Sequence, residues 1–324
     1  MAKYRQTSVK IIVLIYVDLV QRQGLPCLCF NIYNFDPNVL YVACIDPYDY
    51  NDKIPENFVS AIWRTNDCTV QNPVWTDITP GLAGLRGGFI TSIAVNPHDA
   101  NEIWVGISHA NQSGYKKLYH KVVGSTDWAP MSTGLPDPPL PVNDIEIDYH
   151  GNLYAATDIG VFYKARTSTE WTEFGGLKKC ITDIGINHND AELYACVFGR
   201  GMWAKDISCW GSVADELNPL DIYTQVAVEE GTFYDGCFDI HIFSGGIFTI
   251  NGLAVMSPFS KIRVKSGGKL IVNGGMIYFA DIVVESGGIL EIKNGGYVHK
   301  GVDDEVICNI GGFFNFYHGS VKSW

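Results

Sequence analysis

Four segments of this chain repeat one pattern, and this repetition limits the possible folds more than any other feature of the sequence. Each copy has an apolar strand with alternating side chains, a turn rich in Asn, Asp, Pro or Gly, and a second strand. The copies start near residues 31, 90, 142 and 181. Strand–turn–strand is the signature of a β-hairpin, and about 40 to 50 residues is the period of a four-stranded propeller blade. The repeats therefore predict an all-β protein with a partial β-propeller of about four blade-like repeats.

A tryptophan follows each of the first three copies. These residues are Trp75, Trp128 and Trp171, and the first two are preceded by Asp67 and Asp127. A short Asp side chain can hydrogen-bond the backbone of its own turn, and a Trp ring can pack over the hairpin that it closes. We therefore expect these five residues to stabilise the blades.

The strand–turn–strand unit with its (S/T)xD…W ending resembles the Asp-box (BNR) repeat of sialidase-like and xyloglucanase-like propellers. The FGRGMW stretch at 198–203 is similar to the closing blade of such propellers in secreted bacterial proteins. The resemblance covers roughly residues 27–207, although the first box carries an insertion, the second is compressed and the third lacks its aspartate. It implies a propeller in a secreted or cell-surface bacterial protein. Because the boxes of the resembling enzymes lie away from the active centre, it concerns the fold and not the chemistry.

The pattern of residues changes at about residue 240. SGG recurs at 266 and 286, and NGG recurs at 273 and 294, each after a short alternating strand. A parallel β-helix turns sharply at every corner, and glycine accepts the positive φ that such corners require. The pattern predicts a short parallel β-helix, or solenoid, over 240–324. Its inner column should contain four apolar pairs, namely Ile262/Val264, Leu270/Val272, Ile282/Val284 and Leu290/Ile292.

Two further segments complete the domain organisation. In residues 1–26, the basic residues Lys3, Arg5 and Lys10 precede the β-branched run IIVLIYV, and we interpret this segment as an N-terminal strand or a degenerate export segment. Residues 208–239 are acidic and mixed, and we interpret them as a linker, with a first β-helix turn as the alternative. No segment has the length of a transmembrane helix.

Charge and cysteine content narrow the classes of partner and cofactor. The net charge of −12 argues against nucleic acid and against anionic membrane surfaces, and the lack of a segment of transmembrane length argues against membrane insertion. The nine cysteines include no CxxC pair, so we expect no zinc site and consider Cys44–Cys68 and Cys209–Cys237 as disulfide candidates. We expect no cofactor, although calcium at the acidic run 303–305 is an alternative.

The carboxyl groups at inner-strand positions that could take part in catalysis are Asp144, Glu146, Asp158 and Asp183, and we retain two of them, Asp144 and Asp183, as candidates. Asp144 and Asp183 occupy equivalent places in successive repeats, in the sequences NDI and TDI. Glycoside hydrolysis needs two facing carboxyl groups, but their recurrence in the repeat favours a structural role. No arginine triad for a sialidase-like site is visible among Arg64, Arg86, Arg166 and Arg200.

The leading hypothesis is a non-catalytic extracellular or cell-surface module that binds a glycan or an extracellular protein, with the β-helix as a stiff spacer. Trp104, Tyr115, Tyr119 and Trp203 are the candidate glycan platforms, since aromatic rings stack on sugar faces, and the alternative for most of them is a place in the core or at the closure of a blade. The competing hypothesis is the C-terminal portion of a glycoside hydrolase with a sialidase/xyloglucanase-like propeller. Closed propellers use about four to eight blades, and those that this chain resembles tend toward the upper end, whereas the sequence shows three full repeats and a final partial one. We therefore expect the chain to be part of a larger secreted protein.

Overall fold

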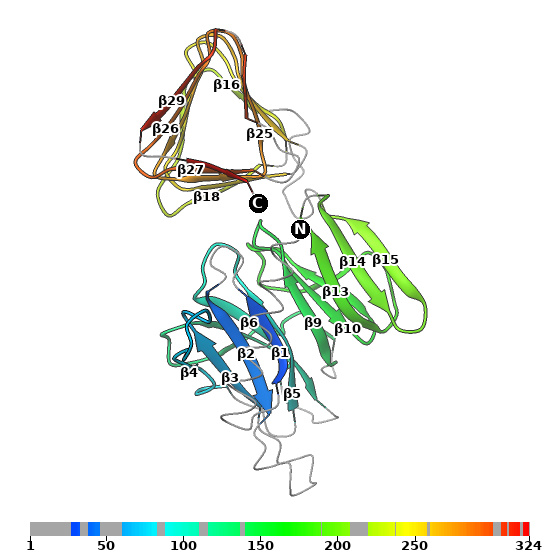
Figure 1. The fold of residues 1–324 in the computed structure, drawn as a ribbon. Helices are drawn as coiled ribbons and strands as arrows, with labels where there is room; N and C mark the ends of the chain where they lie inside the picture. The colour runs from blue at the N-terminus through cyan, green and yellow to red at the C-terminus, as the bar shows by residue number, and fades with distance from the viewer. Residues whose placement is uncertain are drawn as a thin grey trace, which may run out of the picture. The chain divides into compact units, whose positions relative to one another are not determined.

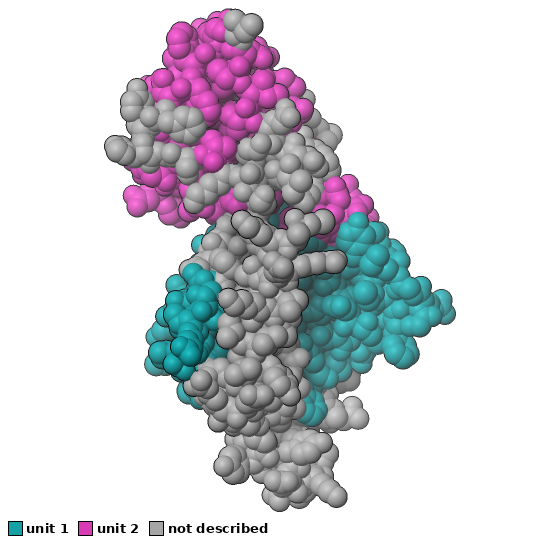
Figure 2. All heavy atoms as spheres, in the orientation of Figure 1, with its two compact units in different colours: residues 1–186, 194–204 teal, residues 187–193, 205–324 magenta. Residues whose placement is uncertain are grey.

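The computed structural model consists of β-strands joined by turns. It describes residues 27–32, 38–45, 60–82, 88–109, 116–136, 140–188, 190–207, 220–236, 238–257, 260–300, 306–309, 311–317 and 320–323. Within these ranges no helix is long and apolar enough to cross a membrane. The chain divides into two compact units, residues 1–186 with 194–204 and residues 187–193 with 205–324 (Figure 2).

Unit 1 contains four small antiparallel sheets in chain order, which we call the first to fourth blades (Figure 1). The first blade has β1 (Cys27–Ile32), β2 (Leu40–Ile45), β3 (Ser60–Thr65) and β4 (Thr76–Asp77). The second has β5 (Gly88–Val95), β6 (Glu102–His109), β7 (Leu118–Val122) and β8 (Ala129–Pro130). The third has β9 (Val142–Ile147), β10 (Leu153–Thr157), β11 (Gly160–Lys164) and β12 (Thr172–Phe174), and the fourth has β13 (Ile181–Asn187), β14 (Glu192–Val197) and β15 (Gly201–Asp206). The propeller-like architecture expected from the repeats is confirmed.

Apolar side chains from neighbouring blades share common cores. One core joins the first and second blades and includes Tyr41, Ile62 and Ile93, all almost fully buried. A second core joins the second and third blades and includes Trp104 and Ile145. Because each strand is short and each sheet has few strands, the faces of the sheets are buried mainly by the next blade.

The tryptophans after the repeats connect one blade to the previous one. The Nε1 atom of Trp128 donates to the carbonyl oxygen of Ile78 at 3.1 Å, and that of Trp171 donates to the carbonyl oxygen of Met131 at 2.8 Å. Both rings are buried. These side chains therefore bridge adjacent blades, a contact that the sequence pattern did not predict.

Buried lysines hold the turns before these tryptophans. Lys121 donates from Nζ to the carbonyl oxygen of Ser125 at 2.7 Å, and Lys164 makes the same contact with Ser168. The Asp127 side chain is exposed and accepts from the Thr126 hydroxyl at 3.2 Å. In the first blade, Asp67 accepts from the backbone N–H of Thr69 at 2.9 Å. The turns thus have local side-chain support, but their identity as Asp-boxes is not confirmed.

Of the two disulfide candidates, the structure describes one. Cys44 and Cys68 are buried in the same small core with Leu40 and Val42, on the face of the first blade that is turned away from the second. Cys209 and Cys237 lie outside the described residues, as does the acidic run 303–305.

Unit 2 is a three-sided parallel solenoid (Figure 1). Its first sheet contains β16 (Leu220–Ile222), β19 (Ile240–Ile242), β22 (Lys261–Val264), β25 (Asp281–Val284) and β28 (Val306–Cys308). Its second contains β17 (Gln225–Val228), β20 (Ile247–Ile250), β23 (Lys269–Asn273), β26 (Ile289–Lys293) and β29 (Phe313–Tyr317). Its third contains β18 (Phe233–Gly236), β21 (Leu253–Met256), β24 (Met276–Tyr278), β27 (Tyr297–Lys300) and β30 (Ser320–Ser323). The first coil starts at Leu220, inside the segment predicted as a linker.

The predicted inner column of the solenoid is confirmed. Ile262 pairs with Ile282 and Leu270 pairs with Leu290 in parallel register, and these side chains are fully buried. Glycine makes the corners possible, because Gly267 has a φ of +77° and a Cβ on Gly268 would lie 2.2 Å from the carbonyl oxygen of Ile242. The stacked coils therefore depend on both features that the sequence repeats.

Outside the solenoid, polar side chains pair between coils. Lys261 Nζ lies 3.1 Å from Oδ2 of Asp281 in an ion pair. Asn273 donates from Nδ2 to Oδ1 of Asn251 at 2.7 Å. Asn294 continues this ladder by donating to Asn273 at 2.6 Å. These contacts fix the register of each coil on the one before it.

Shortening an inward side chain of the solenoid should destabilise it strongly. We expect Leu270→Ala to lower the free energy of unfolding by about 2–5 kcal/mol, because it leaves a cavity in a closed column. Ile271→Ala is the matched control, since Ile271 points outward on the same strand and should cost roughly 1 kcal/mol or less. Urea denaturation followed by circular dichroism measures both, and equal costs would contradict the inward and outward assignment.

Candidate functional site

At the junction between the second and third blades, two polar side chains of β5 bind the backbone of the third blade. Thr91 donates from its hydroxyl to the carbonyl oxygen of Val142 at 2.5 Å. Ser92 accepts at its hydroxyl oxygen from the backbone N–H of Ile145 at 3.2 Å. Thr91 lies at a β-bulge in β5, which lets two consecutive residues of this strand contact the next blade.

The junction between the third and fourth blades repeats this arrangement. Asn143 donates from Nδ2 to the carbonyl oxygen of Ile181 at 2.8 Å, and Asp144 accepts at Oδ2 from the backbone N–H of Ile184 at 3.0 Å. Asn143 lies at a bulge in β9, as Thr91 does in β5. Asp144 thus occupies the place of Ser92, and its carboxyl group joins two blades.

Asp144 also belongs to a cluster of three carboxyl groups. A hydrogen bond between the carboxyl groups of Asp144 and Asp183 brings the two catalytic candidates together. Desolvation raises the pKa of Asp144, and the hydrogen bond with Asp183 raises it further. Desolvation and then the charges of Asp144 and Asp183 raise the pKa of Glu146 to about 8. The cluster therefore holds protons at neutral pH that isolated carboxyl groups would have lost.

Two features decide what this cluster can do. A carboxyl group that stays protonated at neutral pH is what a general acid requires, and Glu146 meets that condition. However, both oxygens of Asp144 already accept backbone N–H groups, with Ile145 donating to Oδ1 at 2.9 Å and Ile184 to Oδ2. A sialidase-like site would also need arginines. Of those considered in the sequence, Arg64 donates to Oδ1 of Asn101 at 2.9 Å and Arg200 lies in the exposed turn before β15. The residues described include no group of three or more His, Cys, Asp or Glu side chains arranged to hold a metal ion.

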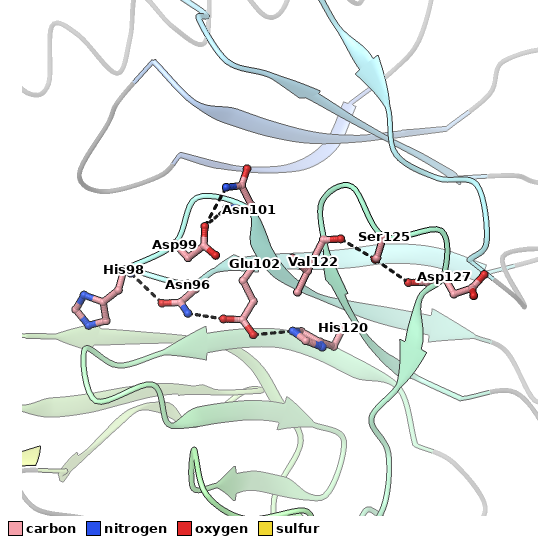
Figure 3. A network of polar contacts seen from close by, with 9 residues as sticks. All are labelled: Asn96, His98, Asp99, Asn101, Glu102, His120, Val122, Ser125 and Asp127. Atoms are coloured by element: carbon pink, nitrogen blue, oxygen red, sulfur yellow. Dashed lines mark hydrogen bonds and ion pairs between the residues drawn. The ribbon is translucent and has the colours of Figure 1, made fainter. Parts of the chain in front are cut away.

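A second polar network lies at the hairpin turn of the second blade (Figure 3). The Asn96 amide donates to Oε2 of Glu102 at 2.5 Å, and Nε2 of His120 lies 2.8 Å from Oε1 of Glu102. His98 extends from this turn to the third blade, where its Nε2 lies 2.6 Å from the carbonyl oxygen of Tyr149. Burial lowers the pKa of His98 to about 4, so its ring is neutral at physiological pH. This network orders the turn and links two blades.

The aromatic residues proposed as glycan platforms are mostly inside the blades. Trp104 is 6% exposed and stacks on His120 with ring centroids 4.9 Å apart, and Tyr119 is 5% exposed. These two rings are core residues, since they end in shared inter-blade cores and cannot present a face to a sugar. Trp203 is half-buried and makes a T-shaped contact with Phe174, and Tyr115 lies outside the described residues.

The solenoid carries an exposed aromatic pair that sequence reasoning missed. Tyr223 and Phe243 stack with centroids 4.7 Å apart and ring planes 9° from parallel, and Tyr223 is 58% exposed. Beside them, His241 lies 3.2 Å from Asp221. The sequence did contain a signal for this pair, because Tyr223 and Phe243 are about one coil apart and residues at that spacing stack in a solenoid. It was missed because residue 223 was assigned to a linker.

The carboxyl cluster should make stability fall as the pH rises. The ordinary pKa of Glu146 is 4.5 and its folded value is about 8, so between these values the folded state binds a proton that the unfolded state has lost. We expect the melting temperature to fall from pH 6.5 to pH 8 and Glu146→Gln to reduce that fall, leaving the variant more stable than the wild type at pH 8. Calorimetry at several pH values measures this.

The window above pH 6.5 avoids the opposite contribution of His98. Its folded pKa of about 4 lies below the ordinary 6.5, so its contribution to stability is lost only as the pH falls from 6.5 toward 4. Asp144 has a raised pKa as well, and the double variant Asp144→Asn/Glu146→Gln should flatten the curve further. Parallel curves for wild type and both variants would refute the assignment.

Comparisons with known proteins give likenesses of fold at low identity. No family model matches this chain, and no curated protein matches it. The chain is similar to the extracellular domain of the putative one component system BT4673 from B. thetaiotaomicron, with 15% identity and a TM-score of 0.39 over 57% of this chain and 22% of that one. It is similar to PorZ, a surface component of the type-IX secretion system of Porphyromonas gingivalis, with 17% identity and a TM-score of 0.40 over 60% and 28%.

A third likeness is to YCF48 bound to D1 peptide, with 14% identity and a TM-score of 0.37 over 53% of this chain and 48% of that one. This chain therefore spans less than a third of the first two proteins and about half of YCF48. At such low TM-scores the likenesses assign neither a family nor an activity, and the propeller-like architecture rests on the strand pairing described above.

Proposed function

We propose that this chain is a non-catalytic binding and structural module. The observation that carries the proposal is the position of Asp144, whose two carboxyl oxygens accept backbone N–H groups of Ile145 and Ile184. Ser92 performs the same task in the previous blade, where it accepts from Ile145. This position holds serine in one blade and aspartate in the next, and the property that the two side chains share is an oxygen that accepts a hydrogen bond. The strongest catalytic candidate is therefore explained by the joint between blades.

We further propose a glycan as the ligand and the solenoid as the surface that binds it. Tyr223 presents an exposed ring whose other side is held by Phe243, so little conformational freedom would be lost on binding. Asp221 and His241 stand beside the rings and offer hydrogen-bonding groups to sugar hydroxyls. A rigid aromatic platform with flanking polar groups is suited to a carbohydrate.

An extracellular or cell-surface location is part of the same proposal. It is supported by the resemblance of the repeats to those of secreted bacterial proteins. The acidic net charge of −12 would keep such a module soluble.

A glycoside hydrolase remains the alternative function, because one observation favours it. Glu146 has a pKa of about 8 and lies near Asp144 and Asp183, so a protonated acid and an ionisable carboxylate share one site. In that reading, Glu146 would protonate the leaving group and one aspartate would act as nucleophile or base.

Glycan binding by the solenoid can be tested with one substitution and one control. Tyr223→Ala should weaken binding to any glycan retained on an array by roughly tenfold, because it removes a stacking ring. Phe313→Ala is the control, since Phe313 is also 58% exposed and lies on the last coil. Binding that is equal in wild type and Tyr223→Ala would remove this platform from the proposal.

Catalysis by the carboxyl cluster can be tested separately. We expect the wild-type chain to release no product from aryl glycosides or from xyloglucan. If hydrolysis is observed and is abolished by Asp144→Asn while the variant stays folded by circular dichroism, the chain is an enzyme. Glu146→Gln should then abolish the same activity, because it removes the proton donor.

A further inference from the structure

A column of outward polar side chains runs along the first sheet of the solenoid, on the side that Figure 1 labels with β16 and β25. Asp221, His241 and Arg263 occupy the same register position on the three successive strands β16, β19 and β22. Nδ1 of His241 lies 3.2 Å from Oδ1 of Asp221. On the next strand, β25, this position is held by Val283. Arg263 therefore lies between a histidine that already has an acidic partner and an apolar residue.

The exposed aromatic pair lies in the column next to this one. Tyr223 and Phe243 follow the first two members of the polar column by two residues, on the same coils. The His241 ring also contacts the Phe243 ring, at 89° and with centroids 6.1 Å apart. The column that contains Arg263 is thus continuous with the platform proposed for a glycan.

Arg263 differs in its pairing from the lysines around it. Three lysines on the outside of the solenoid each form an ion pair with a carboxylate one coil further on, namely Lys261 with Asp281 at 3.1 Å, Lys265 with Glu285 at 2.5 Å and Lys269 with Glu291 at 2.5 Å. Arg263 is the one arginine in residues 205–324. It is half-buried, and its guanidinium has no ion-pair partner among the residues that the structure describes. This positive charge is therefore available to an anionic ligand.

The chemistry of a guanidinium selects the kind of anion. Its N–H donors form a planar fork that matches the two oxygens of a carboxylate, and it is more weakly hydrated than an ammonium group. The net charge of −12 does not oppose such binding strongly, because charges on the surface beyond about 8 Å are largely screened at physiological ionic strength. A carboxylate on the ligand is thus the expected partner of Arg263.

The spacing of the coils sets the size of the ligand. Neighbouring strands in a sheet are about 4.8 Å apart, so the backbone of Arg263 lies about 10 Å from that of Tyr223, two coils away. One sugar ring is too short to stack on Tyr223 and also place its carboxylate on the guanidinium. A ligand that contacts both residues must be a chain of sugars.

We propose that the solenoid binds an oligosaccharide containing uronic acid along these two columns. A carboxylate of one sugar binds Arg263, and another sugar of the same chain stacks on Tyr223. This inference rests on the proposed function, because it names the class of glycan that the aromatic platform binds.

The test uses isothermal titration calorimetry on the full chain. The probes are the trimers of galacturonate and of glucuronate, each next to its methyl ester, in which the carboxylates are neutral. The wild type should bind at least one acidic trimer about tenfold or more tightly than its ester. Arg263→Gln should reduce the affinity for that acid to the level of the ester and leave the affinity for the ester unchanged. The corresponding monomer should bind more weakly than the trimer, because it cannot contact both residues.

Lys269→Gln is the matched control. It also removes one positive charge from an outward position of the solenoid, but on the second sheet and from a lysine that is already paired with Glu291. This variant should keep the preference for the acidic trimer. An equal loss of that preference in both variants would show a general effect of charge and overturn the assignment to Arg263.

The outcomes separate this inference from the proposed function. If acid and ester bind equally to the wild type and Tyr223→Ala weakens both, the role of Arg263 is refuted and the aromatic platform stands. The same conclusion follows if neither trimer binds while neutral glycans are retained on an array and lost in Tyr223→Ala. If no glycan binds in either experiment, both proposals are refuted.

Discussion

The structure of unit 1 depends on how the faces of its small sheets are covered. A sheet of three or four short strands cannot stand alone in water, and each face must find another apolar surface. The second and third blades meet this need by sharing a core, and side chains on the innermost strands bind the backbone of the next blade. Thr91 and Ser92 do so at one junction, and Asn143 and Asp144 do so at the next. Burial supplies the stability and these polar contacts set the register between blades.

Unit 2 meets the same need by a different route. Each coil places one strand in each of three parallel sheets, so the next coil covers its edges and the interior is closed by stacked apolar side chains. Pairs such as Val264 with Val284 repeat the same contact from coil to coil. Stability then grows by addition of similar units, which is the behaviour of repeat proteins. The ion pairs and asparagine ladder on the outside add register and little net free energy.

Sequence periodicity predicted the features that depend on local residue pattern, such as which side chains point into the solenoid. It did not predict the contacts that a side chain makes with a neighbouring sheet. The inner column with Leu270 and Ile282 followed from alternation and the glycine repeat, because a period of two fixes which side chains point inward. The reach of Trp128 to the carbonyl oxygen of Ile78 was not predictable, since nothing near residue 128 says which sheet lies above it. The bulge at Asn143 also shifts the alternation in β9 and turns two successive polar side chains toward the next blade.

The carboxyl cluster shows how a structural repeat can imitate a catalytic site. The position of Ser92 and Asp144 requires an acceptor for a backbone N–H, and either side chain satisfies that requirement. When aspartate fills the position in two successive repeats, the carboxyl groups of Asp144 and Asp183 come within hydrogen-bonding distance. Two such groups cannot both be ionised cheaply, so retaining a proton is the favourable response.

The raised pKa of Glu146 then follows from its burial beside this pair and needs no substrate to explain it. Perturbed pKa values cluster at active sites, but networks that join structural elements produce them as well. What distinguishes the two is whether the oxygens are available to a reacting atom. Both oxygens of Asp144 are held by backbone N–H groups, and releasing either one would weaken the joint between the third and fourth blades. A reaction at Asp144 would therefore require the loss of a hydrogen bond that holds these two blades together.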